Sequence, residues 1–320
     1  MHTFSRAAFV ATAASLALSP VMGSAQAAKP LIRVGSGPDD QSTPLLYASK
    51  YGVYAKYGLN VEIVKLQGAA AVAAALAGGS LEVGKSASLA VVQAIGRGLP
   101  FTVIGNVAYY NSSRPDTALV VYASSDVRTP KDLEGKTLGA VSLQDMNSIG
   151  TFAWLDQYGV DRSTLKYVEL PSSAVLAAME QGRIVASTVL EPYLSSYLAT
   201  GKIRILGYPF DAIGKHFSQG LLFTSTAWAG GHRDEIARFL AATDEGAKFI
   251  AAHDDVSTKL SAEFGGMDTS AIPNVRHAER GVPVSAAEIQ PVIDAAAKYK
   301  VIPQAYSAAT MLCSCALMRR

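Results

Sequence analysis

The sequence predicts an α/β fold of two lobes, each a mainly parallel sheet with flanking helices, with a cleft between them and two chain crossings that form a hinge. Strand-like and helix-like segments alternate at the spacing of βαβ units from residue 31 onward, and the alternation restarts near residue 117. No linker rich in Pro, Ser or Gly separates the two units. The 320 residues, 49% hydrophobic and 17% charged, suffice for the cores of two lobes.

The first unit opens with a predicted strand at residues 31–37 and a helix within residues 42–58. Thr43 can cap this helix, Pro44 suits its first turn and Gly58 follows its end. The segments that follow alternate in type: strand 59–66, helix 68–79, strand 81–84, helix 88–98 and strand 101–105.

The second unit is predicted from residue 117. Its segments are strand 117–123, helix and strand within 130–141, helix 147–159, strand 165–170, helix 172–182, strand 183–190 and strand 202–208. The strand-like segments 117–123 and 220–226 bracket the unit, and we take them as the two crossings between lobes.

The remainder is mainly helical. Ile236, Phe239 and Leu240 recur at helical spacing, and Ser285 with Glu288 has the form of a capping box. We therefore expect residues 28–116 to form the first part of lobe 1, residues 117–226 to form lobe 2, and the helices of residues 227–320 to complete lobe 1.

Residues 1–27 are predicted to be a cleaved secretory signal peptide. Arg6 precedes an apolar run, and "AQA" at residues 25–27 fits a signal-peptidase site. A membrane anchor is the alternative, but Thr12 and Ser15 interrupt the run, which is shorter than the roughly 20 residues of a span. We therefore expect an exported, periplasmic protein.

The charge balance gives no indication of nucleic-acid binding. The formal net charge of +2 falls to +1 without the leader, which carries Arg6 and no acid. Cys313 and Cys315 are separated by one residue, so a disulfide between them would close a small strained ring. We expect them to be free or buried rather than a redox centre.

In open α/β sheets, ligands bind beyond the carboxyl ends of strands, where helix N-termini present free N–H groups. This rule selects the junctions "SGPDDQST", "QGAA", "KSAS", "NVAYY", "SLQDMNS", "PSS" and "LEPY". Their Ser, Thr, Asn, Gln and Tyr residues suit a small polar ligand that is held without chemistry. The ligand-binding candidates are Asp40, Ser42, Thr43, Gln67, Lys85, Ser86, Ser88, Asn106, Tyr109, Ser142, Asn147, Ser148 and Glu191.

Lys85 and the neighbouring serines allow two interpretations. Lys85, Ser86 and Ser88 at a helix start would suit an anion, whereas the alternative is a simple helix cap with Lys85 in solvent. Asp39 and Asp40 at the same mouth would favour an amine or another donor, although both can be turn residues. A zwitterion would satisfy both sets.

Catalytic and cofactor motifs are absent or weak. "GSGPDDQS" lacks the third glycine of a dinucleotide fingerprint, and no P-loop, G-x-S-x-G or H-E-x-x-H occurs. His253 with Asp254, and His277 with Glu279, are short polar runs that are more often solvated than metal-binding. We expect no catalytic residues, no metal and no cofactor.

The stretch "TPLLYASKYGVYAKYGLNVEIVKLQGAAAVAAALAGGSLEVGKSASL" resembles the opening of periplasmic solute-binding proteins of ABC importers, of the nitrate, sulfonate and taurine type. The similarity continues through "TPKDLEGKTLGAV", "AAMEQGRIVAS" and "LEPY", and covers residues 34–208. It implies a type II periplasmic-binding fold, a small-molecule ligand in the cleft between lobes, and an ABC permease of the inner membrane as partner. It also implies a monomer.

Three positions depart from the family pattern. Glu82 stands where Asp is common, Val185 where "V-D-A" is frequent, and Leu190 where the family usually has Trp before "EP". The loss of the Trp removes an aromatic surface near the cleft, so the ligand need not match those of better-known relatives.

The first hypothesis is therefore a binding protein that captures a small organic anion or zwitterion, of the sulfonate, aminosulfonate, nitrate or carboxylate class. The lobes would close over this ligand. One alternative is an enzyme on the same fold, but the related pyrimidine-precursor synthases carry a cysteine-rich motif in mid-chain that is missing here. Another alternative is an exported ligand sensor.

Overall fold

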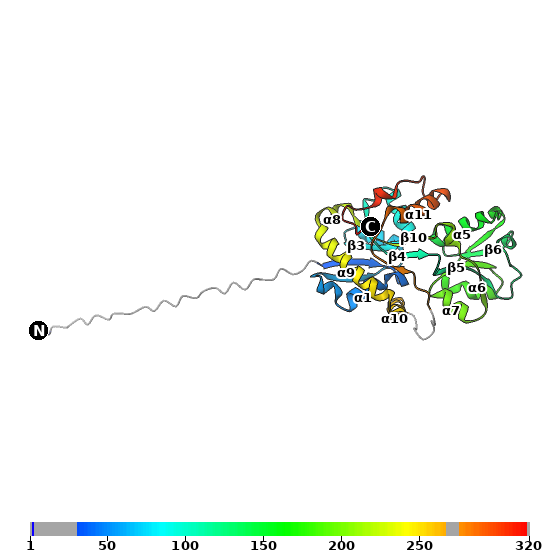
Figure 1. The fold of residues 1–320 in the computed structure, drawn as a ribbon, viewed down its shortest axis with the longest axis horizontal. Coiled ribbons are helices and arrows are strands. Elements are labelled where there is room, and N and C mark those ends of the chain that lie inside the picture. The colour runs from blue at the N-terminus through cyan, green and yellow to red at the C-terminus, as the bar shows by residue number, and fades with distance from the viewer. Residues whose placement is uncertain (1, 3–30, 267–274, 319–320) are drawn as a thin grey trace.

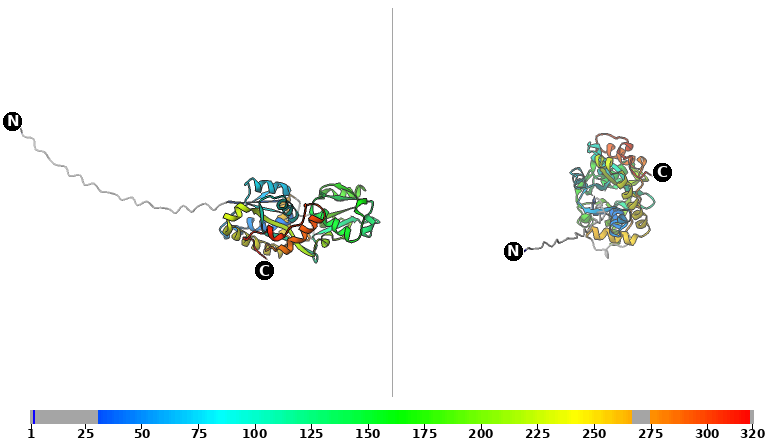
Figure 2. Two further views of the ribbon diagram at one scale, coloured as in Figure 1. Left: turned by 90° about the horizontal axis from the view of Figure 1, so that it is seen from above. Right: turned by 90° about the vertical axis from the view of Figure 1, so that its left-hand side faces the viewer.

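The computed structural model describes residue 2, residues 31–266 and residues 275–318. The predicted signal peptide lies outside the described residues apart from His2. Two lobes lie side by side, each built on one β-sheet with helices around it (Figures 1 and 2). The predicted two-lobed α/β fold is confirmed.

Lobe 1 contains a six-stranded sheet in the order β11-β4-β10-β3-β1-β2. Its strands are β1 (Leu31–Ser36), β2 (Asn60–Lys65), β3 (Val83–Ala87), β4 (Phe101–Asn111), β10 (His216–Ser225) and β11 (Glu279–Arg280). Its helices are α1 (Thr43–Lys50), α2 (Val53–Lys56), α3 (Ala69–Ala77), α4 (Ser88–Gly96), α8 (Thr226–Gly231), α9 (Arg233–Ala251), α10 (Asp254–Gly265) and α11 (Ala286–Lys298).

Lobe 2, green in Figure 1, contains a five-stranded sheet in the order β7-β6-β8-β5-β9. Its strands are β5 (Thr117–Tyr122), β6 (Thr137–Ala140), β7 (Lys166–Glu169), β8 (Ala186–Leu190) and β9 (Ile203–Gly207). Its helices are α5 (Met146–Gln157), α6 (Val175–Glu180) and α7 (Tyr193–Ala199).

Both sheets are mixed rather than mainly parallel. The strands β1, β2 and β3 pair in parallel, as do β6, β7 and β8. The strands next to the crossings pair antiparallel: β10 with β3 and β4, and β5 with β8 and β9. The βαβ spacing therefore predicted the parallel half of each sheet, whereas the strands next to the crossings were predicted as strands without their antiparallel pairing.

The structure moves both predicted crossings, because residues 117–123 fall largely within β5 of lobe 2 and do not connect the lobes. The first crossing, residues 112–116, joins β4 to β5, and the second, residues 208–215, joins β9 to β10 and includes the 3₁₀ helix η5 (Pro209–Ala212). The predicted second crossing at residues 220–226 instead falls largely within β10, which lies between β4 and β3 in lobe 1. Its apolar "GLLF" run is buried as a central strand, so lobe 2 ends before β10.

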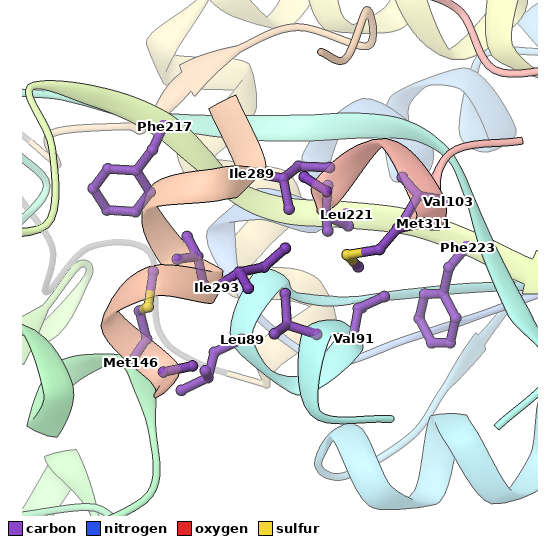
Figure 3. Close-up of a cluster of buried hydrophobic side chains, with 14 of the residues drawn as sticks. Leu89, Val91, Val103, Met146, Phe217, Leu221, Phe223, Ile289, Ile293 and Met311 are labelled. Atoms are coloured by element: carbon purple, nitrogen blue, oxygen red, sulfur yellow. The ribbon is translucent and has the colours of Figure 1, made fainter. Parts of the chain in front are cut away.

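Two hydrophobic clusters flank the sheet of lobe 1. One contains Ile236, Phe239 and Leu240 of α9, the positions whose spacing predicted a buried helical face. The other, shown in Figure 3, packs α4 and α11 against the sheet and includes Met146 from the start of α5. The C-terminal helices thus complete lobe 1, and lobe 2 contributes to its core.

The C-terminal segment corrects a further expectation. Cys313 and Cys315 form a disulfide rather than remaining free. Within the described ranges, no helix combines the length and apolar character needed to cross a membrane.

Candidate ligand-binding site

A cavity of about 240 Å³ lies between the lobes. It is lined from both lobes and both crossings by Asp39, Asp40, Gln41, Ala87, Asp116, Thr117, Asp145, Met146, Asn147, Leu190, Glu191, Phe210 and Gln219. A cavity of about 150 Å³ accepts a benzene ring, so this one has room for a small ring or branched chain with polar groups attached.

Most residues of this lining lie at the ends of strands or directly after them. Asp39 and Asp40 follow β1, Ala87 ends β3 and Leu190 ends β8. Asp145 caps α5 by accepting a hydrogen bond from the Ser148 N–H at 2.8 Å. Because the carboxyl ends of the parallel strands in both sheets point toward the cleft, these junctions converge on it, as the rule for open sheets predicts.

Lys85 is buried and forms an ion pair with Asp39. Burial lowers the pKa of Lys85, and the negative charge of Asp39 opposes this shift. Lys85 does not line the cavity, whereas Asp39 does. The lysine is therefore neither a surface residue nor a free anion clamp, because its positive charge serves to neutralise a carboxylate at the mouth.

Asp40 is buried and bound to two basic side chains. Its Oδ1 lies 2.6 Å from His277 Nδ1, and its Oδ2 accepts a hydrogen bond from Arg280 Nη2 at 2.5 Å. Burial alone would raise the pKa of Asp40, but the charge of Arg280 and the hydrogen bond from His277 lower it well below its ordinary value. Asp40 is therefore ionised, with both oxygens already engaged.

Three further carboxyl groups line the cavity without an ion-pair partner among the described residues: Asp116, Asp145 and Glu191. Burial raises the pKa of each, and that of Asp116 to about 7. Glu191 accepts hydrogen bonds from Ser195 N–H and Oγ–H, at 3.0 and 2.7 Å, and from Arg276 N–H at 3.2 Å. The Arg276 bond links lobe 2 to lobe 1.

The remaining wall is apolar. Met146, Leu190 and Phe210 present side chains to the cavity, and Ala87 adds a small surface. Phe210 is buried and makes an edge-on contact with Tyr110 at a centroid distance of 5.4 Å. Leu190 occupies the position at which the resembled family usually has Trp, so this wall is aliphatic there.

Among the candidates from sequence, Asp40, Asn147 and Glu191 line the cavity. Ser42 and Thr43 are buried behind it, where Ser42 donates to Gly37 O at 2.8 Å and Thr43 to Asp40 O at 2.9 Å. Ser148 Oγ donates to Ser142 O at 2.6 Å and so shapes the turn before α5.

The other candidates do not reach the cavity lining. Gln67 is exposed, while Ser86 and Ser88 are buried. Asn106 donates to Gly281 O at 3.0 Å, and Tyr109 donates to the Pro283 carbonyl. Ser86 and Ser88, which one interpretation of the sequence made contacts of an anion, thus belong to the packed junction of β3 and α4.

Three of the lining residues that the sequence reasoning missed lie in the crossings or in the long strand β10. Asp116 precedes β5, Phe210 lies in η5 and Gln219 lies within β10. A charged residue directly before the apolar run "TALVV" was a usable signal for Asp116. Gln219 inside a buried strand was a second signal, because buried polar side chains require partners.

The lining contains no Ser, Cys, His, Lys or Arg. Across the described parts of the chain, no group of three or more His, Cys, Asp or Glu side chains is arranged to hold a metal ion. The described lining therefore offers polar groups and an apolar wall to a ligand, and it presents no cationic side chain.

The family model described as "NMT1/THI5 like" matches residues 39–257. The aliphatic sulphonate binding protein SsuA of Escherichia coli has a similar structure, with a TM-score of 0.76 and 19% identity over 88% of this chain and 97% of that chain. The alkanesulfonate-binding protein SsuA of Xanthomonas axonopodis, bound to MOPS, has a TM-score of 0.72 and 18% identity over 90% and 99%.

The nitrate-binding protein NrtA of Synechocystis has a TM-score of 0.71 and 12% identity over 89% of this chain and 85% of that chain. No curated protein sequence matches the chain. The resemblance predicted from the sequence is confirmed. Because the family match spans more than half of its length, the chain belongs to the NMT1/THI5-like family.

Proposed function

We propose that the protein is the solute-binding component of an ABC importer, which captures a small organic molecule in the periplasm and delivers it to a permease of the inner membrane. The observation that carries this proposal is the cavity of about 240 Å³, which both lobes and both crossings line with polar and apolar side chains. Such a cavity is completed only when the lobes approach each other, which couples ligand capture to closure.

The similar structures support this role. Two are named as sulfonate-binding proteins and one as a nitrate-binding protein, and the Escherichia coli and Synechocystis proteins are named as periplasmic. We propose that this protein works in the same compartment, as a monomer, and catalyses no reaction.

Among the ligand classes predicted from the sequence, the lining favours those that carry a donor group. Among the described residues, five carboxyl groups and no cation line the cavity, and cations behind the lining compensate only two of the five, so nitrate or a simple sulfonate would meet no positive side chain there. An aminosulfonate or another zwitterion presents a positive group to these acids.

The test begins with the protein produced in a periplasm with its leader intact. Unfolding the purified protein should release a small molecule that mass spectrometry identifies, and the same molecule should bind the refolded protein in a one-to-one complex by calorimetry. A protein of unrelated fold, prepared in parallel, is the control for carry-over. Chemical conversion of the molecule during incubation would contradict the proposal and favour the enzyme alternative.

A further inference from the structure

One end of the cavity, formed by Asp116 and Gln219, offers hydrogen-bond acceptors that lack donors. Gln219 is 5% exposed, and its Oε1 has no hydrogen-bond partner among the described residues. Its Nε2 donates to Asp116 Oδ1 at 3.3 Å, which orients the amide toward the carboxyl. A buried acceptor without a donor costs free energy, and a donor on a bound ligand would recover it.

The carboxyl group of Asp116 needs a donor from the ligand even more than the Gln219 amide does. It is 5% exposed, and its hydrogen bonds come from two neutral groups, Gln219 Nε2 and Thr117 Oγ1, the latter at 3.2 Å. No cation lies within ion-pair distance of it in the described part of the chain. A buried carboxylate without a positive partner is unfavourable unless the ligand brings one.

The charged groups around Asp116 do not supply that partner. On the side of the 3₁₀ helix η1 (Asp40–Ser42), Asp40 faces it, and Arg280 and His277 are both engaged with Asp40. On the β4 side, the phenol of Tyr110 lies within its electrostatic reach.

The other acids of the lining add to the excess of negative charge around the cavity. Asp145 and Glu191 come from the lobe 2 side and have no ion-pair partner among the described residues, whereas Lys85 compensates Asp39 and Arg280 compensates Asp40. A ligand with a positive group is thus the occupant that the charges of the cavity favour.

From these contacts we propose that the cavity selects a ligand with a protonated amine or amidinium group, which Asp116 and Gln219 bind while the ligand's apolar body packs against Met146, Leu190 and Phe210. The inference rests on the proposed solute-binding function and assigns its recognition chemistry. Negative charge elsewhere on the ligand is compatible with it, but is not what the cavity recognises.

The test uses four probes with one apolar body: benzylamine, benzamidine, phenylmethanesulfonate and 4-(aminomethyl)benzenesulfonate. Calorimetry on the ligand-free full-length mature protein compares wild type with Asp116→Asn, which keeps the shape and removes the charge. Asp126→Asn is the matched control, because Asp126 is an exposed acid of lobe 2 outside the cavity. We expect the amine and amidine probes to bind wild type and the control, and to bind Asp116→Asn on the order of 10- to 100-fold more weakly.

Proton linkage gives an independent readout. Burial raises the pKa of Asp116 to about 7, so a positive ligand should displace up to about half a proton at pH 7. Calorimetry in two buffers of different ionisation enthalpy measures this release, which the Asp116→Asn variant should lose. A recognised anion would cause proton uptake instead.

Two results would overturn the inference. Binding of phenylmethanesulfonate alone, with proton uptake, would leave the solute-binding function intact and remove the amine recognition. Binding of none of the three nitrogen-bearing probes would also reject it, and the molecule released from the periplasmic protein would then decide whether the solute-binding function survives.

Discussion

Replacing Asp116 with asparagine should stabilise the ligand-free protein at high pH. Asparagine has nearly the same shape and can still accept the hydrogen bonds of Gln219 and Thr117. Burial raises the pKa of Asp116 from 3.8 to about 7, so the folded state holds a proton that the unfolded state releases. The wild type therefore loses stability from this group as pH rises from about 4 to about 7, and loses nothing more above that range.

The size of this stabilisation follows from the shift in the pKa of Asp116. Roughly three pK units at 1.36 kcal/mol each set an upper limit of about 4 kcal/mol at pH 8. Water in the adjacent cavity reduces the cost of the ionised form, so we expect the variant to be more stable by about 1–3 kcal/mol at pH 8. Near pH 4 the carboxyl group is mostly protonated in the folded state, and the difference should shrink to a few tenths of a kcal/mol.

Urea unfolding followed by circular dichroism at pH 4, 6 and 8 measures this difference directly. Both proteins must first be stripped of ligand by unfolding and refolding, since bound ligand would add its own stabilisation. Asp126→Asn controls for a change of net charge at an exposed site. An equal difference at all three pH values, or a variant less stable at pH 8, would refute the reasoning.

Three further predictions concern the same region. Asp40→Ala should cost about 3–5 kcal/mol in urea unfolding, because it leaves Arg280 buried without its carboxylate; a loss below 1 kcal/mol would contradict this. Glu191→Ala removes the acceptor for Arg276 N–H and should weaken ligand binding about 5- to 10-fold in calorimetry. Unchanged affinity would show that this interlobe bond does not favour closure. Ser88→Ala should leave affinity unchanged and stability equal or slightly higher by thermal unfolding, since the Ser88 hydroxyl is buried without a partner and Ala favours the helix; weaker binding would place it in the site.

The sequence predicted most of the segments that line the candidate cavity. The rule that ligands lie beyond strand ends selected the segments that contain Asp40, Asn147 and Glu191, and the structure brings these to one cavity. The rule did not tell, for every segment, which residue faces the cavity. In the junction of β3 and α4, for example, Ala87 faces the cavity while Ser86 and Ser88 pack behind it, because the first turn of the helix decides the direction of each side chain.

The crossings show why the rest could not be predicted. Alternating strands and helices have a local signature, whereas a strand that returns to the first sheet is defined by partners more than a hundred residues away. Gln219 fell just outside the strand predicted at residues 220–226, which was interpreted as a crossing, and its position beside Asp116 depends on the pairing of β10 with β4. Among the five acids of the lining, Asp116 lies in a crossing, whereas the other four lie in junctions that the sequence had selected.

The contacts between the lobes indicate where an opening motion would pivot. Met146, Ile149 and Phe210 are buried with side chains of lobe 1, and burial of each such side chain contributes about 1.5–3 kcal/mol. Across the mouth, the bond from Arg276 N–H to Glu191 is a single hydrogen bond with a net value of about 1 kcal/mol. Opening should therefore break the mouth contact first and keep the packed contacts beside the crossings, so that the lobes rotate about the start of α5 and η5 instead of separating. Asp116, next to this pivot, would remain in place while the wall formed by Glu191 moves away, which allows the positive end of a ligand to bind before the cavity closes.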